Sequence, residues 1–206
     1  MKEKEQLKFW KEQYTDEYIV RNSEFDLKLG LEAWNIITKK IDQPIENILE
    51  CGSNIGRNIN FLNHVYPDAE KSIIEVAEKP FQIVTSRYKL KHTFNGPLVN
   101  SDFPKNSFDL VFTNSVLIHI HPDEVLDNMK KMYDYSKNYI LISEYFNRTP
   151  TMIEYRGELN KLFKSDFGKT FITNFNVELV DYGFLWGHIY DNAGFDDITY
   201  WVFKKK

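Results

Sequence analysis

The residues best suited to chemistry form a turn rich in glycine and acidic residues near position 50. Glu50-Cys51-Gly52-Ser53-Asn54-Ile55-Gly56 follows an apolar run, and Glu75 ends the next apolar run. The glycines allow a tight turn that approaches a ligand closely. A carboxylate at the end of the second strand can accept hydrogen bonds from both hydroxyls of a ribose, and Glu50 can orient the turn or meet an amino group. The pattern therefore predicts a nucleoside-containing cofactor.

An ordinary strand-to-helix turn is the alternative interpretation of the two glycines alone. Glu75 and the periodic elements around the turn favour cofactor binding instead. Asn54 fills the middle place of a Gly-x-Gly-x-x-Gly fingerprint, and the turn lacks the lysine of a phosphate-binding loop. Dinucleotides and nucleoside triphosphates are therefore weaker candidates.

The spacing of apolar residues predicts alternating strands and helices around this turn. The expected strands of the alternating part are 45–50, 72–76, 97–101, 108–113 and 139–143. This alternation favours the α/β class, with a doubly wound, mostly parallel sheet that binds ligands beyond the carboxyl ends of its strands. Two late strands, 177–184 and 198–203, are expected to be antiparallel and to complete a seven-stranded Rossmann-like sheet.

A single domain is expected to account for residues 1–206. Residues 1–40 have a helical pattern and are expected to form an N-terminal cap. The polar and aromatic segment 147–176 interrupts the alternation, which indicates an insertion over the carboxyl edge of the sheet, on the substrate side.

Composition and charge argue against several classes of function. The formal net charge of −4 disfavours a broad nucleic-acid surface. The charged segment Met1–Gln6 is unlike a signal peptide, and no apolar stretch approaches the length of a membrane span. Cys51 is the only cysteine, so no disulfide can form within the chain, which fits a reducing compartment. We expect a cytoplasmic protein without nucleic-acid or membrane partners; the oligomeric state stays open.

Polar residues that follow the later strands are expected at the cofactor edge. Asp102 follows the expected third strand, where a carboxylate can accept a hydrogen bond from an adenine amino group. A plain turn acid before Pro104 is the alternative for Asp102. Asn114 and Ser115 end the fourth strand, and simple turn residues are the alternative there.

Further motifs accompany the turn along nearly the whole chain. They are Phe9-Trp10, Tyr18, Arg21-Asn22, Phe108–Thr113, Val116–Pro122, Glu144–Asn147, Pro150, Tyr155–Glu158, Leu162–Lys164, Asp166-Phe167, Asp181–Phe184 and Asp196–Thr199. With them, the chain resembles the methyltransferases associated with pseudaminic acid biosynthesis, within the class I S-adenosylmethionine-dependent superfamily. One departure is Ala77, where a polar side chain such as Asn is expected; this departure would loosen adenosine recognition or mark a divergent position.

The resemblance implies S-adenosylmethionine as the cofactor and S-adenosylhomocysteine as the product. It also implies that the N-terminal segment closes over the cofactor, with Arg21 near the methionine carboxylate. Trp10, Tyr18 and Arg21 lie near helical spacing, so an aromatic docking face is the alternative. The expected cofactor-binding residues are Trp10, Tyr18, Arg21, Glu50, Cys51, Gly52, Asn54, Gly56, Asn58, Glu75, Val76, Ser101, Asp102, Asn114 and Ser115.

The acceptor is expected beside the end of the fifth strand and the insertion. By resemblance it is a small molecule, an anionic sugar or nucleotide-sugar of the pseudaminic acid type. An arginine can grip a carboxylate with two parallel hydrogen bonds, although Arg156 could equally form an intramolecular ion pair, and Tyr145 could serve packing. The expected substrate-binding residues are Tyr145, Asn147, Tyr155, Arg156 and Lys164.

Two residues are candidates for the base that a hydroxyl acceptor would need, Glu144 and His119. A structural histidine is the alternative for His119. His119 and His121 are too few to hold a metal, so no metal is expected, and His121 is expected to cap the following helix. Methylation of protein or RNA, or a cofactor- or sugar-binding module of the same fold without turnover, are the alternative functions.

Overall fold

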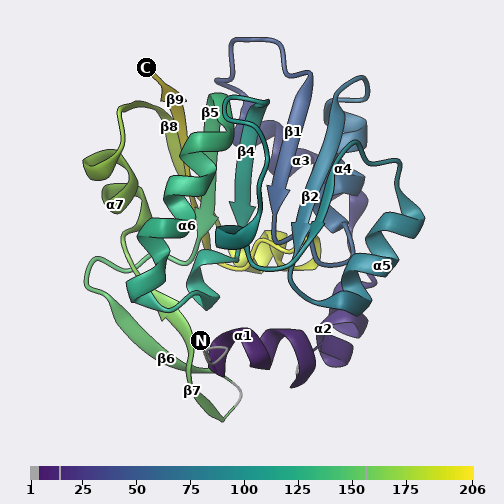
Figure 1. Ribbon diagram of the computed structural model, residues 1–206, viewed down its shortest axis with the longest axis vertical. Helices are drawn as coiled ribbons and strands as arrows, with labels where there is room; N and C mark the ends of the chain where they lie inside the picture. The colour runs from purple at the N-terminus through teal and green to yellow at the C-terminus, as the bar shows by residue number, and fades with distance from the viewer. Residues whose placement is uncertain (1–4, 14, 156) are drawn as a thin grey trace.

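A seven-stranded sheet forms the centre of the computed structural model, which describes residues 5–13, 15–155 and 157–206 (Figure 1). Its strand order is β3-β2-β1-β4-β5-β9-β8. The strands are β1 (Asn47–Cys51), β2 (Glu70–Glu75), β3 (Thr93–Asn95), β4 (Phe108–Asn114), β5 (Ser136–Glu144), β8 (Val177–Leu185) and β9 (Ile198–Lys205). The first five strands pair in parallel, and β9 is antiparallel to both β5 and β8. The predicted mostly parallel, Rossmann-like sheet is confirmed.

Helices cover both faces of the sheet and bury two apolar clusters against it. On one face, α3 (Leu27–Thr38) and α4 (Arg57–Val65) contribute the fully buried Trp34 and Phe61. On the other face, α6 (Pro122–Tyr135) and α7 (Phe167–Asn174) contribute Met129 and Phe171. A further helix, α5 (Glu78–Arg87), follows β2 and contributes Val84 to a third, small cluster. The buried faces follow the apolar periodicity of each helix.

Short elements complete the chain between these helices and strands. They are the 3₁₀ helices η2 (Leu98–Asn100), η3 (Leu117–His119) and η4 (Asp191–Ala193), and the short helix α8 (Gly187–Tyr190). His121 caps α6 through its Nδ1 atom, which accepts a hydrogen bond from the Asp123 N–H at 3.3 Å, so the predicted cap is confirmed.

The third strand lies earlier in the chain than predicted. The prediction placed it at 97–101, but β3 is Thr93–Asn95 and the predicted segment contains η2. Gly96 has a φ of 156° and Pro97 follows it. Because proline has no N–H to donate to a ladder, the chain leaves the sheet there. This shift moves the residues between β3 and β4 relative to the ligand-binding edge.

The N-terminal segment and a hairpin lie below the edge where the parallel strands end, which we call the carboxyl edge (Figure 1). The segment comprises α1 (Glu5–Lys8), the π-helix η1 (Phe9–Gln13) and α2 (Thr15–Asn22). The antiparallel hairpin comprises β6 (Thr151–Tyr155) and β7 (Glu158–Lys164). The predicted insertion, 147–176, thus contains this hairpin and α7, and only the hairpin reaches the carboxyl edge.

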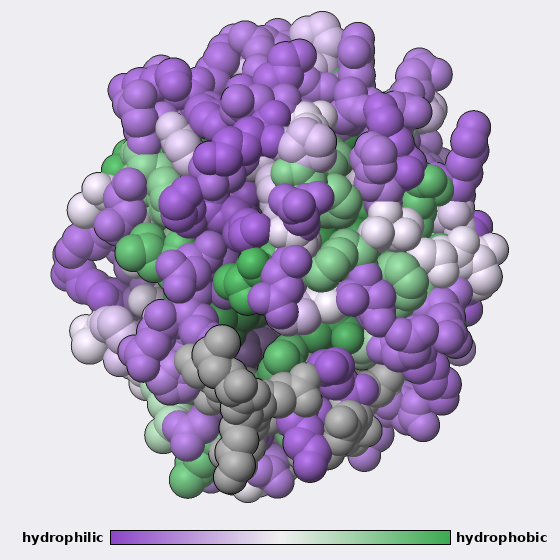
Figure 2. Space-filling model, in the orientation of Figure 1, coloured by the Kyte–Doolittle hydropathy of each residue, from purple (hydrophilic) through white to green (hydrophobic). Residues whose placement is uncertain are grey.

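The face seen in Figure 2 is largely hydrophilic, and hydrophobic residues gather near the middle of the view. Among the described residues, every helix is too short or too polar to cross a lipid bilayer.

Candidate functional site

The turn after β1 has a backbone that excludes most side chains. Gly52, Asn54 and Gly56 have φ values of 85°, 47° and 86°. A Cβ atom on Gly52 would lie 2.5 Å from Val116 Cγ2, and one on Gly56 would lie 2.7 Å from Val84 Cγ2. Asparagine tolerates the left-handed region better than other side chains do. The glycines are therefore required here both by conformation and by close packing.

Glu75, at the end of β2, holds this turn from the neighbouring strand. Its Oε2 accepts a hydrogen bond from the Asn54 N–H at 2.6 Å, and its Oε1 accepts one from the Ala77 N–H at 2.9 Å. Burial raises the pKa of the Glu75 carboxyl, and hydrogen bonds from backbone N–H groups oppose that shift. Since a carboxylate offers about four lone-pair sites, Glu75 retains acceptor capacity for hydroxyl groups.

Ala77, the departure from the family pattern, occupies the N-cap position of α5 and makes no side-chain capping bond. Its backbone N–H nevertheless binds Glu75 Oε1. Val76 is partly buried between these two residues. The link between Glu75 and the start of α5 is thus made by backbone atoms that any residue at 77 other than proline could supply.

Glu50, on β1, begins a buried polar network beneath the turn. Its Oε1 accepts a hydrogen bond from Asn58 Nδ2 at 2.7 Å; Asn58 Oδ1 accepts from Asn114 Nδ2 at 3.4 Å. Asn114 Oδ1 in turn accepts from Ser143 Oγ at 3.1 Å. Burial raises the Glu50 pKa to about 8. Three of the predicted cofactor residues, Glu50, Asn58 and Asn114, therefore meet at one place below the carboxyl edge.

The second carboxyl oxygen of Glu50 is a hydrogen-bond acceptor that the expected cofactor could use. Glu50 Oε2 is buried and has no hydrogen-bond partner among the described residues. Buried oxygens are normally satisfied by protein, water or ligand. A polar group of a cofactor seated on the turn, such as its ammonium, would satisfy this oxygen, so the residues fit the expected group.

Cys51 and Ser115 contribute less directly. The Cys51 side chain is buried in the apolar cluster of the α6 face, and burial raises the pKa of its thiol. Cys51 therefore offers only backbone atoms to the site. Ser115 has a φ of 59°, and its N–H donates to the Ser143 carbonyl at 2.8 Å, which turns the chain sharply at the end of β4.

The structure contradicts the prediction that Ser101 and Asp102 belong to the site. Tyr135, at the end of α6, donates its hydroxyl to the Ser101 carbonyl at 2.6 Å. Phe103, which follows Asp102, packs its ring 5.6 Å from that of Phe108, the first residue of β4. Residues 101–103 thus lie where β4 begins, at the opposite end from the turn. The cause is the misplaced third strand.

The segment that does follow β3 at the carboxyl edge was missed. Asn95 Nδ2 and the Gly96 N–H both donate to the Glu75 carbonyl at 2.9 Å. Asn95-Gly96-Pro97 is a strong turn signal in the sequence, and it could have identified the end of this strand.

Three contacts tie α2 across the carboxyl edge. Lys79 on α5 forms an exposed ion pair with Asp16 at 2.6 Å. Arg57, at the start of α4, donates from Nη1 to Asn22 Oδ1 at 2.7 Å. Arg21 donates from Nη1 to Tyr155 Oη on β6 at 3.3 Å. The helix is thereby joined to both flanks of the site.

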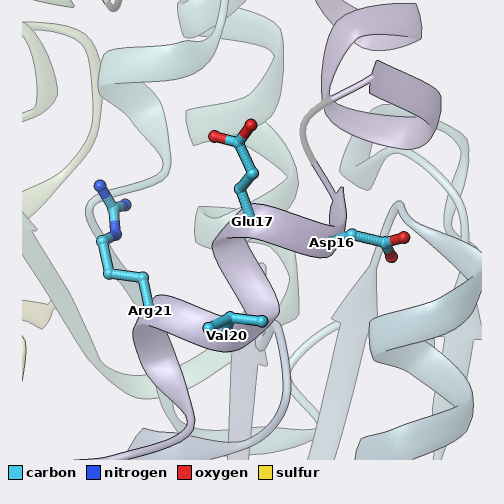
Figure 3. A pocket seen from close by; sticks show the side chains of 4 residues that line it. All are labelled: Asp16, Glu17, Val20 and Arg21. Carbon is cyan, nitrogen blue, oxygen red and sulfur yellow. The ribbon is translucent and has the colours of Figure 1, made fainter.

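One face of α2 lines an open hollow of about 470 Å³ (Figure 3). The lining residues are Asp16, Glu17, Val20 and Arg21. A hollow of this size is in the range that holds small molecules. Of the predicted residues around it, the side chain of Tyr18 and all of Arg156 lie outside the described part of the chain.

His119, in η3, lies between the N-terminal segment and the hairpin. Its Nδ1 is 2.9 Å from the Lys161 carbonyl oxygen on β7. Its ring centroid is 4.0 Å from that of Trp10 and 5.6 Å from that of Tyr155. Burial lowers the His119 pKa to about 4, and the positive charge of Arg21 acts in the same direction. His119 is therefore neutral near pH 7, with one ring nitrogen engaged by the hairpin.

Glu144, the other predicted base, is fully buried at the end of β5 and holds η3 in place. Its Oε1 accepts hydrogen bonds from the N–H groups of Val116 and Leu117 at 3.1 Å, and its Oε2 accepts one from Ile118 at 3.3 Å. Burial raises the Glu144 pKa to about 7, and these backbone bonds oppose the shift. This geometry favours a positioning role for Glu144 rather than the expected role as a base.

The remaining predicted substrate residues lie around the base of the hairpin. Tyr145 Oη donates to Asp196 Oδ2 at 3.2 Å, and Lys164 Nζ lies 4.9 Å from the Tyr145 ring. Asn147 Nδ2 donates to Thr151 Oγ1 at 2.7 Å, within the hairpin. Tyr155, at the tip of the hairpin, contacts both His119 and Arg21.

Lys161 is the residue of this region that the sequence did not single out. It is buried on β7, and its Nζ lies 5.2 Å from the Phe9 ring. A lysine in a strand is normally taken for a solvated side chain, so its sequence carried no signal. Among the described residues, no group of three histidine, cysteine or acidic side chains could hold a metal ion.

Comparisons with known proteins agree with this geometry. Residues 49–135 match the family model described as "Methyltransferase domain". A phosphoethanolamine N-methyltransferase of Plasmodium falciparum (isolate 3D7) is 26% identical over 151 residues, which are 65% of this chain and 54% of that protein. The chain thus spans about half the length of this curated relative.

Two solved structures with bound cofactor share the fold. The 1,6-didemethyltoxoflavin-N1-methyltransferase of Burkholderia thailandensis, with S-adenosylhomocysteine, has a TM-score of 0.69 at 14% identity, covering 94% of this chain and 84% of that one. The magnesium protoporphyrin IX methyltransferase of Synechocystis PCC 6803, with bound SAM, has a TM-score of 0.71 at 10% identity, covering 100% of both chains. The sheet and its helices therefore have the class I methyltransferase fold.

Proposed function

We propose that this chain, which contains an S-adenosylmethionine-dependent methyltransferase domain, methylates a small anionic acceptor. The acceptor we favour is an acidic sugar or nucleotide-sugar of the pseudaminic acid type. The observation that carries the proposal is the position of Arg21, which lies beside His119 and Tyr155 and lines the open hollow along α2.

The turn after β1 would hold the cofactor. Glu75 would accept hydrogen bonds from the ribose hydroxyls, and Glu50 Oε2 would accept one from the ammonium group, since it is the buried oxygen without a partner among the described residues. Gly52 and Gly56 give the turn the left-handed backbone that brings its N–H groups to the carboxyl edge. When bound, S-adenosylmethionine supplies a methyl group that its sulfonium has already activated.

The N-terminal segment and the hairpin would bind the acceptor and exclude water. Arg21 places positive charge beside His119, and the buried Lys161 carries its Nζ against the Phe9 ring of the N-terminal segment, which suits an anion. The rings of Trp10 and Tyr155 flank the same histidine and limit the site to a small molecule. Holding the reacting atoms in line in a water-poor site is the main contribution that a protein makes to this transfer.

The relatives support a small-molecule acceptor, because the toxoflavin, magnesium protoporphyrin and phosphoethanolamine enzymes are all named for small molecules. They do not favour a sugar over other acceptors. The sugar assignment rests on the sequence motifs and on the two cations, Arg21 and Lys161.

The proposal is tested in two stages. Calorimetric titration with S-adenosylmethionine should give micromolar binding by the wild-type protein. Release of S-adenosylhomocysteine is then measured with free and nucleotide-linked acidic sugars, and with neutral sugars of the same size as the control. Turnover restricted to the acidic compounds supports the proposal, while binding without any turnover across the panel would point to another acceptor or to a binding module.

A further inference from the structure

We propose that strand β7 fixes the tautomer of His119, with Lys161 as the positioning residue, so that the ring accepts a proton from the acceptor through Nε2. The role of His119 as a base rests on the proposed function. The assignment of the tautomer rests only on the hydrogen bond between His119 and Lys161 and needs no bound ligand.

The tautomer follows from the hydrogen bond between the two residues. The Lys161 carbonyl oxygen lies 2.9 Å from His119 Nδ1. A carbonyl can only accept, so Nδ1 must carry the hydrogen and donate it. In a neutral imidazole the other nitrogen, Nε2, then holds the lone pair. Histidine in water prefers the opposite tautomer, with the hydrogen on Nε2, so the hairpin imposes the less common form.

The position of that carbonyl depends on how the hairpin docks. A two-stranded hairpin is at best marginally stable by itself. Here Leu162, next to Lys161, is 4% exposed and packs in the apolar cluster of the α6 face. Phe163 packs its ring 5.8 Å from that of His121, and Phe146 pairs with Ser165 at the base of the hairpin. The core therefore sets the register that presents Lys161 to His119.

The groups that face His119 keep the ring neutral and fix its plane. The Trp10 ring lies tilted against it and the Tyr155 ring meets it edge-on, and Arg21 places a positive charge nearby. With Nδ1 engaged by the Lys161 carbonyl, Nε2 is the nitrogen left to meet an acceptor.

This arrangement narrows the chemistry of the acceptor. A base is useful only where the attacking atom carries a proton, as in a hydroxyl or an ammonium group. The acceptor O–H or N–H proton would pass to Nε2 as the bond from oxygen or nitrogen to the methyl carbon forms and the bond from sulfur to that carbon breaks. The imidazolium then returns the proton to solvent. A carboxylate acceptor, which has no proton to lose, would not need this histidine.

Nitrogen-15 NMR of the imidazole rings tests the tautomer without turnover. The His119 signals are assigned by comparison with His119→Gln. In the wild-type protein near pH 7 we expect a protonated Nδ1 and a bare Nε2. The hairpin is then weakened by Leu162→Ala, and the matched control is Leu159→Ala on the same strand, whose side chain is 58% exposed. We expect the Nε2–H tautomer to gain population in Leu162→Ala only.

A second variant covers the case in which Leu162→Ala stays docked. Because Thr151 pairs with Lys164, residues 152–163 can be replaced by two glycines that join neighbouring ends. Loss of the Nδ1–H form in this variant, with circular dichroism that shows an intact sheet, supports the inference. An Nε2–H tautomer in the wild-type protein, or an Nδ1–H form that survives removal of the hairpin, overturns it. If the tautomer is found but no acceptor is methylated, the proposed function fails and the positioning of His119 stands.

Discussion

Asn54 and Glu75 are joined across two strands, because the Asn54 N–H donates to Glu75 Oε2 at 2.6 Å. One carboxylate thus holds the turn after β1 and, through its other oxygen, the start of α5. The strongest test of the site is therefore a change at Glu75.

Glu75→Gln should weaken binding of S-adenosylmethionine about 10- to 100-fold, since hydrogen bonds to a charged group contribute about 1.5–3 kcal/mol. Calorimetric titration measures this effect. The control is Glu78→Gln on the exposed first turn of α5, which should bind the cofactor as the wild-type protein does. Equal affinity in both variants would remove Glu75 from the site.

Gly52→Ala should lower stability by about 2–4 kcal/mol, from left-handed strain of about 1–2 kcal/mol and overpacking against Val116. Gly157→Ala is the matched control. Its φ is 82°, but a Cβ there meets nothing within 4 Å. Thermal unfolding should show a clearly smaller loss at Gly157, and similar losses would mean that the contact with Val116 relaxes without cost.

Glu144→Gln should destabilise the protein by about 1–3 kcal/mol, because an amide N–H₂ would then face backbone N–H donors that the carboxylate accepts. The Tm should fall, and methyl transfer should fall with it. The dependence of kcat on pH should keep its wild-type midpoint. A lost or displaced midpoint with an unchanged Tm would restore Glu144 as the base.

Protonation of the buried His119 ring should make the protein less stable in mild acid. The folded-state pKa is about 4, below the ordinary value of 6.5, so the unfolded chain binds more protons between these values. Stability contributed by His119 is therefore complete above about pH 6.5 and lost towards pH 4, by at most about 3 kcal/mol.

Urea denaturation from pH 7 to pH 4 measures this loss in the wild-type protein and in His119→Gln. The variant should lose less stability over the window. Glu50 and Glu144 have raised pKa values and act in the opposite direction, but they do so in both proteins. Parallel curves for the two proteins would show that His119 is solvated.

Asn22→Ala should loosen α2, because the Arg57 guanidinium loses an acceptor at 2.7 Å whose residue is 6% exposed. Amides of α2 should exchange hydrogen faster, and cofactor affinity should fall. Lys79→Gln is the control, since its ion pair with Asp16 is exposed and pairs of this kind contribute about 0–1 kcal/mol. If only the control shows faster exchange, α2 is held by its ion pair with α5 and not by the hydrogen bond between Arg57 and Asn22.

The sequence predicted the fold where local rules decide it. Apolar periodicity gave the alternation of strands and helices, and Gly52 and Gly56 marked a turn whose φ values only glycine adopts freely. The wrong prediction of the third strand also has a local cause. The edge strand Thr93–Asn95 is too short to show a period of two, whereas the neighbouring segment 97–101 contains an apolar run.

Only the tertiary structure decided how the acceptor side is built. His119 and Lys161 meet through a backbone carbonyl, and every residue carries a carbonyl, so no residue type in the sequence could announce this contact. The position of Glu144 at the end of a strand predicts a base, but in the structure three backbone N–H groups donate hydrogen bonds to its two oxygens. The sequence determined most of the side chains that reach the carboxyl edge, and Ser101 and Asp102 are the exceptions that the misplaced third strand caused. Packing of the hairpin against the core determined which of their atoms remain available for a ligand, because that depends on contacts between segments far apart in the chain.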